Sequence, residues 1–129
     1  LTTTYNWNVT TSHKPNGYLE LNTQVVFNSN SDRYVTPGTS TNSLTTYVQF
    51  NDSSEEHIAY CFHSVPGFSQ IGLYTGDGNS PGTYVPTGFK PAFVMIKGLD
   101  NVSDWIIFDS KRSGSNPNRA LLYANQDTA

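Results

Sequence analysis

Residues 92–109, AFVMIKGLDNVSDWIIFD, contain two dense apolar runs. Ala92 to Lys97 and Trp105 to Asp109 have the length and the aromatic and β-branched content of strands. Gly98, Asp100 and Asn101 between them are typical of a turn. Both runs are apolar at successive positions, which predicts strands covered on both faces, as in the middle of a sandwich.

Shorter strand-like segments recur along the rest of the chain, and no window keeps a helical period of apolar residues. The further predicted strands are at residues 18–21, 24–27, 44–50, 57–62, 68–74 and 120–123. Clusters rich in Asn and Ser at 28–32 and 113–118 predict turns. We therefore predict an all-β domain over residues 1–129, with antiparallel strands forming a β-sandwich, jelly roll or lectin-like fold.

The composition argues against several classes of protein. The 129 residues carry a formal net charge of −3, and the few Lys and Arg are scattered, so no nucleic-acid footprint is present. The sequence has no run of 18 apolar residues, so no membrane-spanning helix is predicted. Cys61 is the single cysteine and cannot close an internal disulfide; we predict that it is buried inside the strand at 57–62.

The glycine-rich stretch at 72–88, GLYTGDGNSPGTYVPTG, invites comparison with a phosphate-binding loop. The dinucleotide pattern fails because Pro81 stands where its third glycine belongs, and Pro86 and Pro91 forbid the helix that should follow. The glycines therefore predict turns. Exposed aromatic faces beside Asn and Asp suit carbohydrate, and the loop candidates for ligand binding are Asp77, Asn79 and Tyr84.

Metal binding and catalysis find little support. The oxygen-rich loops at 77–79 and 100–104 do not match the spacing of a calcium loop and read as turns. His13, His57 and His63 share no metal-ligand spacing, although His57 and His63 would share one face of a regular strand. No serine lies in a G-x-S-x-G motif, and Cys61 has no evident base. We predict a protein that is not an enzyme and needs no cofactor.

An internal sequence similarity, called the internal echo below, relates a stretch near the start of the chain to one near its end. The stretch WNVTTSHKPNGYLELNTQ from Trp7 and the stretch WIIFDSKRSGSNPNRALLYANQ from Trp105 share an order of features: Trp, an extended run, basic residues, a Pro-Asn turn and Tyr or Leu. Two copies suggest a slice of a longer repetitive protein as an alternative to a single closed domain.

A specific set of motifs resembles a known family. The motifs are FHSVPGFS at 62–69, GLYTGDG at 72–78, TGFKPAFVMIK at 87–97 and WIIFDSKR at 105–112. Over residues 57–125 the chain resembles a domain, often in tandem, of virion structural and tail-fibre proteins of marine tailed bacteriophages, cyanophages among them. Asp77 departs from the family's usual Asn, and the family continues past the position of residue 129 with a further S-x-G-F stretch.

The resemblance implies a non-enzymatic structural module of the virion, in a tail fibre, an appendage or a capsid decoration. Its expected partners are copies of itself and other virion proteins, and contact with a host-surface polysaccharide stays open. The alternative is a carbohydrate-binding module of a secreted bacterial or extracellular-filament protein; a glycan hydrolase is a third hypothesis. The aromatic residues predicted to form the core are Phe62, Phe68, Phe89, Phe93, Trp105 and Phe108.

Overall fold

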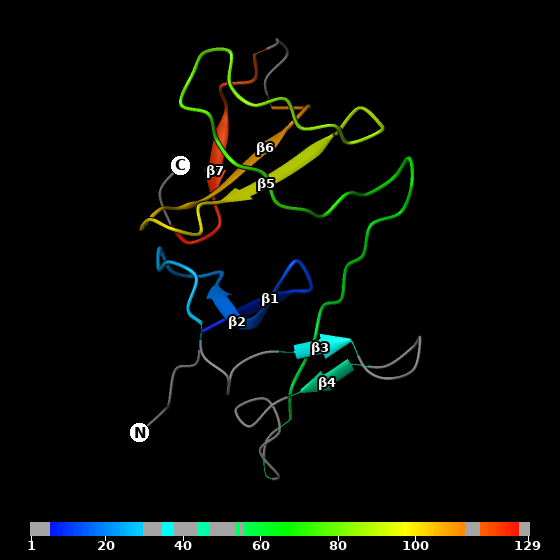
Figure 1. Ribbon diagram of the computed structural model, residues 1–129, viewed down its shortest axis with the longest axis vertical. Coiled ribbons are helices and arrows are strands. Elements are labelled where there is room, and N and C mark those ends of the chain that lie inside the picture. The colour runs from blue at the N-terminus through cyan, green and yellow to red at the C-terminus, as the bar shows by residue number, and fades with distance from the viewer. Residues whose placement is uncertain are drawn as a thin grey trace. The chain divides into compact units, whose positions relative to one another are not determined.

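The computed structural model describes residues 6–29, 35–37, 44–46, 54, 56–112 and 117–126. These residues contain seven strands and no helix (Figure 1). The strands are β1 (Asn8–Thr11), β2 (Lys14–Glu20), β3 (Val35–Pro37), β4 (Leu44–Thr46), β5 (Phe93–Lys97), β6 (Trp105–Asp109) and β7 (Leu121–Tyr123).

All the strand pairs are antiparallel, which confirms the predicted all-β class for the described residues. β1 pairs with β2, β3 pairs with β4, and β5, β6 and β7 form a three-stranded sheet in that order. Correspondingly, no described helix is long and apolar enough to cross a membrane.

The described chain forms two compact units, of which the larger contains all seven strands. This strand unit comprises the described residues up to 57 and from 92 onward. The other unit, residues 58–91, is called the loop segment below. It contains no strand, only an isolated bridge between Val65 and Ser69.

The β1–β2 hairpin is packed closely against the chain that follows it. Tyr18 and Asn28 exchange two backbone hydrogen bonds of 3.0 Å. A Cβ atom on Gly17 would lie 2.4 Å from the carbonyl oxygen of Asn28 and 2.4 Å from the ring of Phe27. Only a residue without a side chain permits this close approach, so the glycine fixes how tightly residues 27 and 28 lie on β2.

Trp105 is the centre of the strand unit. It begins β6, is 7% exposed, and its indole Nε1 donates a 2.8 Å hydrogen bond to the carbonyl oxygen of Glu20, 85 residues earlier. Tyr18 and Leu19 are buried beside that acceptor on β2. Burial of a large aromatic ring with its N–H satisfied stabilises a fold without leaving an unpaired polar atom.

Side-chain amides converge on the residue before Trp105. Asp104 Oδ1 accepts hydrogen bonds from Gln24 at 2.6 Å, Asn125 at 2.8 Å and Gln126 at 2.7 Å. Asn125 Oδ1 in turn accepts the backbone N–H of Trp105 at 2.8 Å. We call Glu20, Gln24, Asp104, Trp105 and Asn125 the Trp105 junction, because together they join β2, β6 and the end of β7.

The predicted strands have different outcomes. Those at 92–97, 105–109 and 120–123 correspond to β5, β6 and β7, and the one at 18–21 overlaps the end of β2. The strand predicted at 44–50 is present over 44–46, and its remainder lies outside the described residues, as do 30–32 and 113–116 of the predicted turns.

The prediction of strands at 24–27, 57–62 and 68–74 is wrong. Residues 24–27 hydrogen-bond to the loop between β5 and β6 instead: Phe27 N–H donates to Leu99 O and Gln24 O accepts from Ser103 N–H. Residues 64–71 are held by a local turn and by serine hydroxyls, which replace the bonds of a neighbouring strand.

Some of the aromatic residues predicted for the core are buried or half-buried, and others are exposed. Trp105 is buried, and Phe89 and Phe108 are half-buried. Phe62, Phe68 and Phe93 are exposed, contrary to the prediction; Phe62 and Phe68 lie in a segment without a sheet. Cover of 92–96 on both faces is also contradicted, because Phe93, Val94 and Met95 are exposed and successive side chains point to opposite faces. Cys61 is exposed rather than buried in a strand.

Candidate functional site

The glycine-rich loop is closed by its own polar groups. Asp77 Oδ1 accepts the backbone N–H of Asn79 at 3.0 Å, and the Thr83 hydroxyl donates to Thr75 O at 2.8 Å. Gly78, between Asp77 and Asn79, has a φ of 71°, in the left-handed region. The Asp77 carboxylate therefore shapes an Asx turn, in agreement with the prediction that these glycines form turns.

The three loop candidates for ligand binding are all exposed. Tyr84 is 87% exposed, directly after the threonine that closes the loop. Asp77 and Asn79 are bonded to each other at the tip, and no described hydrogen bond links either of them to Tyr84. The loop thus offers a free aromatic face and polar tip residues, separated along the chain by the closing Thr75–Thr83 contact.

A second turn lies near the start of the loop segment. Phe68 N–H donates to Val65 O at 2.9 Å, with Pro66 and Gly67 between them and a φ of 76° at Gly67. Proline and then a positive-φ glycine at the two central positions are the signature of a type II turn. The turn leaves Phe68 80% exposed.

An open pocket of about 480 Å³ lies beside this turn. Its lining comes only from the loop segment: Ser64, Pro66, Gly67, Gln70, Pro86, Thr87 and Gly88. Neutral polar groups and prolines line it, and no charged side chain does. The lining offers hydrogen bonds to a neutral polar ligand but no group for acid–base chemistry.

Large apolar side chains are exposed along the whole loop segment. Phe62 is 82% exposed, and Ile58 and Tyr60 precede it at alternate positions. The exposed set is Ile58, Tyr60, Phe62, Phe68, Leu73, Tyr74, Tyr84 and Val85. Scattered single apolar residues are normal on a protein surface, but here eight of them fall within the 34 residues of one segment.

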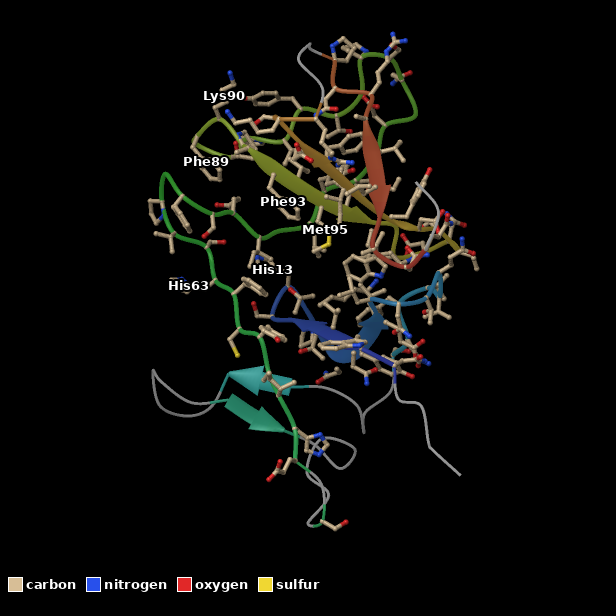
Figure 2. The ribbon with its side chains drawn as sticks, turned by 180° about the vertical axis from the view of Figure 1, so that it is seen from behind. His13, His63, Phe89, Lys90, Phe93 and Met95 are labelled. Carbon is tan, nitrogen blue, oxygen red and sulfur yellow. The ribbon has the colours of Figure 1, made fainter. Side chains whose placement is uncertain are left out.

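β5 adds an exposed apolar strand in the other unit. Phe93 and Met95 project from the same side of β5, as alternation along a strand requires (Figure 2). They are 58% and 44% exposed. β5 is also an edge strand, so its outer backbone groups have no partner strand among the described residues.

His13 and His63 make contacts within their own turns. His13 Nδ1 lies 3.4 Å from the Thr11 hydroxyl, and His63 Nδ1 lies 3.1 Å from Ser64 O. Each ring therefore contacts its own turn, and His57 is exposed. In the part of the chain that the structure describes, no group of three or more His, Cys, Asp or Glu side chains is placed to hold a metal ion.

Asp109 gives a physical reason for the WIIFDSKR motif. Its Oδ1 accepts the backbone N–H groups of Lys111 and Arg112, both at 2.9 Å, and its Oδ2 pairs with the Arg112 guanidinium. The Arg112 side-chain bond is the main cause that holds the pKa of Asp109 below its usual range. Asp109 and Arg112 thus shape the turn that ends β6, and they are not free to serve a ligand.

One known protein family matches the chain. Residues 1–129 match a family described as a domain of unknown function, DUF7483. The chain belongs to this family. No curated protein and no solved structure matches it.

In this DUF7483 chain, the sequence reasoning missed the amides that surround Asp104. It named Asp104 as an oxygen-rich loop residue, whereas Gln24, Asn125 and Gln126 lie in segments that carry no motif. The Asn125 and Gln24 bonds hold the pKa of Asp104 below its usual range. The internal echo was the available signal, because it aligns the Asn-Thr-Gln of 22–24 with the Asn-Gln of 125–126.

Proposed function

We propose that this chain is a non-enzymatic structural module of a virus particle that works by packing against copies of itself and other particle proteins. The single observation that carries this is the concentration of exposed aromatic and aliphatic side chains on the loop segment, with Phe62 and Phe68 the most prominent pair. Apolar surface of this kind gains free energy when an assembly covers it.

Two further observations support the same function. The motifs at 62–69, 87–97 and 105–112 resemble tandem domains of marine tailed-phage virion proteins. The aspartate and arginine of the third motif are occupied in forming a turn, as expected of a structural motif. A sandwich, jelly-roll or lectin-like arrangement belongs to this proposal too, because a second sheet would cover the exposed face of β5.

Self-association of the full chain tests the proposal. Light scattering after size exclusion is expected to show a concentration-dependent oligomer, which the double variant Phe62→Ser/Phe68→Ser weakens. Val102→Ser is the matched control, because Val102 is also exposed but lies in the strand unit, and it should associate like the parent. A monomer at every concentration that also binds no other particle protein would contradict the function.

The virion location needs a separate measurement. An antibody raised against the chain should detect it in purified virus particles from the source culture and label their surface in electron microscopy. Detection only in a cell-envelope or filament fraction would instead support the alternative origin.

A carbohydrate-binding module is the second candidate, and the exposed ring of Tyr84 favours it. A flat aromatic face beside polar turn residues suits a sugar ring. A glycan array probed with the full chain would support this function if Tyr84→Ala removes binding and Tyr60→Ala, an exposed tyrosine that does not flank the closing Thr75–Thr83 contact, retains it. No binding on the array would leave subunit packing as the function of the exposed surface.

A further inference from the structure

The outer edge of β5 has a definite pattern of backbone groups. Ser110 N–H donates to Ala92 O at 2.9 Å, so the pair 92/110 is hydrogen-bonded between β5 and β6. Hydrogen-bonded and non-hydrogen-bonded pairs alternate along an antiparallel ladder. The even-numbered residues of β5 therefore bond to β6, and the N–H and C=O groups of Phe93, Met95 and Lys97 point away from it.

One end of this outer edge is already occupied. Phe27 N–H donates to Leu99 O at 2.9 Å. Leu99 is the next odd-numbered residue after Lys97, so its carbonyl group lies on the same outer edge. Lys97 Nζ donates to Gln24 O, Gly98 O and Ser103 Oγ at 3.0–3.4 Å. Among the described residues, the outer groups of Phe93 and Met95 are left for another strand.

Natural edge strands usually carry a proline, a bulge or an inward-pointing charge that prevents pairing with another chain. β5 has the sequence FVMIK, with an unbroken register to β6 and its single charge at the last residue. It therefore lacks the usual protection, and an exposed edge of this kind is a template for strand addition.

We propose that β5 pairs antiparallel with β5 of a second copy, across a two-fold axis at Val94. In this register Phe93 of one copy lies opposite Met95 of the other, on both sides of the axis. These pairs use all the free outer N–H and C=O groups, and the thioether meets the aromatic ring in a favourable contact. The two three-stranded sheets become one continuous six-stranded sheet.

The proposed register follows from which end of the outer edge of β5 already has hydrogen-bond partners. An axis at Met95 would place Phe93 opposite Lys97 and bring the second copy toward the end of the edge that Phe27 and Gln24 already hold. An axis at Val94 centres the pairing on the free end. The second copy fits this edge because no charged residue lies within 92–96, so no like charges meet across the axis.

This inference rests on the proposed function and names a second surface, besides the loop segment, by which copies of the chain pack. Disulfide trapping tests it in the full chain with Cys61→Ser. Val94 on the axis would be a non-hydrogen-bonded pair with Cα atoms about 4.5 Å apart, within disulfide range. Val94→Cys is expected to form a covalent dimer under mild oxidation, and Val102→Cys, an exposed control, is not.

Proline at the edge provides a second test. Met95→Pro removes an outward N–H group and leaves the β5–β6 bonds intact, so the fold should persist while the dimer weakens at least about tenfold. Trp105 fluorescence monitors the fold of this variant, because the indole is buried in the parent.

Each remaining outcome overturns the inference in a distinct way. Covalent dimer from Met95→Cys but not from Val94→Cys would refute the register. When Cys61 is retained, an intrachain disulfide between Cys61 and the thiol introduced by Val94→Cys would show that residues 58–62 of the same copy occupy the edge. An oligomer without either cross-link would overturn β5 pairing but keep the proposed function. A monomer at every concentration would overturn β5 pairing, and it would overturn the proposed function as well if the chain also binds no other particle protein.

Discussion

The strand unit and the loop segment are built from similar residues yet are held in different ways. The strand unit buries Tyr18, Leu19 and Trp105 by means of contacts that join residues 80 or more apart in the chain. In the loop segment, the hydrogen bonds of Ser64, Ser69 and Thr83 join residues no more than eight apart, and aromatic rings remain exposed. In this chain, apolar side chains are buried where hydrogen bonds join segments that are distant in sequence. The local turns of the loop segment do not bury them.

Removing the indole of Trp105 should give the largest effect. Trp105→Ala is expected to lower the free energy of unfolding by about 3–5 kcal/mol, because a buried ring is lost and Glu20 O loses its donor. Trp105→Phe keeps most of the ring and should cost about 1–2 kcal/mol. Chemical denaturation followed by circular dichroism measures both. If Trp105→Ala were as stable as the parent, the strand unit would not be stabilised by a buried core, and it would not differ from the loop segment in this respect.

Two glycine substitutions compare the regions directly. Gly17→Ala should destabilise the chain by about 1–3 kcal/mol, because its Cβ atom would overlap Asn28 O and the Phe27 ring. Gly76→Ala, in the loop segment, has nothing within 4 Å of the new Cβ and should change stability by less than about 0.5 kcal/mol. Thermal unfolding of the two variants in parallel provides the measurement, and a reversed order would contradict the packing of residues 27 and 28 on β2.

Acid should loosen the strand unit through Asp104. Its pKa is lower in the folded chain than the unfolded value of about 4, because Asn125 and Gln24 donate to its charged form. Its stabilising effect is therefore complete above the unfolded pKa and is lost as the pH falls through the folded pKa. Denaturation midpoints should decline from about pH 5 downward, and the decline should be shallower in Asp104→Asn. Asp100→Asn is the control, because Asp100 is an exposed loop residue. The denaturation midpoint of this variant should decline with pH like that of the parent.

The smallest effect on stability is expected for Phe62→Ser/Phe68→Ser. Both rings are exposed, so the free energy of unfolding of the isolated chain should change by less than about 0.5 kcal/mol per site. The measurement is denaturation at a protein concentration low enough to dissociate oligomers. A loss as large as that of Trp105→Ala would mean that the loop segment has a core of its own.

The sequence predicted the strands with dense apolar runs and missed β1 and β3, which are short and mostly polar. β5 and β6 are separated by a short turn, and their apolar runs identified both. It mispredicted 57–62 and 68–74, where apolar alternation is present but a strand partner is absent among the described residues. Alternation of apolar and polar residues indicates a preference for a sheet, but a strand also needs a neighbouring strand to pair with.

The candidate site was predictable to a similar degree. Turn-forming glycines and an exposed Tyr84 follow from local chemistry. The internal echo aligns the segments of Gln24 and Asn125 but does not indicate that their amides bond to Asp104, because Gln24 is 80 residues away and any exposed amide would look the same in sequence. Local rules therefore described the turns, while the long-range junction required the structure.

The hydrogen bond from Trp105 to Glu20 also sets an order of events during translation. Glu20 leaves the ribosome long before Trp105, and at about 5–20 residues per second the delay for the 85 residues between them is several seconds. During that interval the carbonyl group of Glu20 lacks its indole donor, and in its second half Phe62 and Phe68 have also emerged. The junction around Trp105 can therefore form only after β6 has been synthesised, late in the translation of these residues.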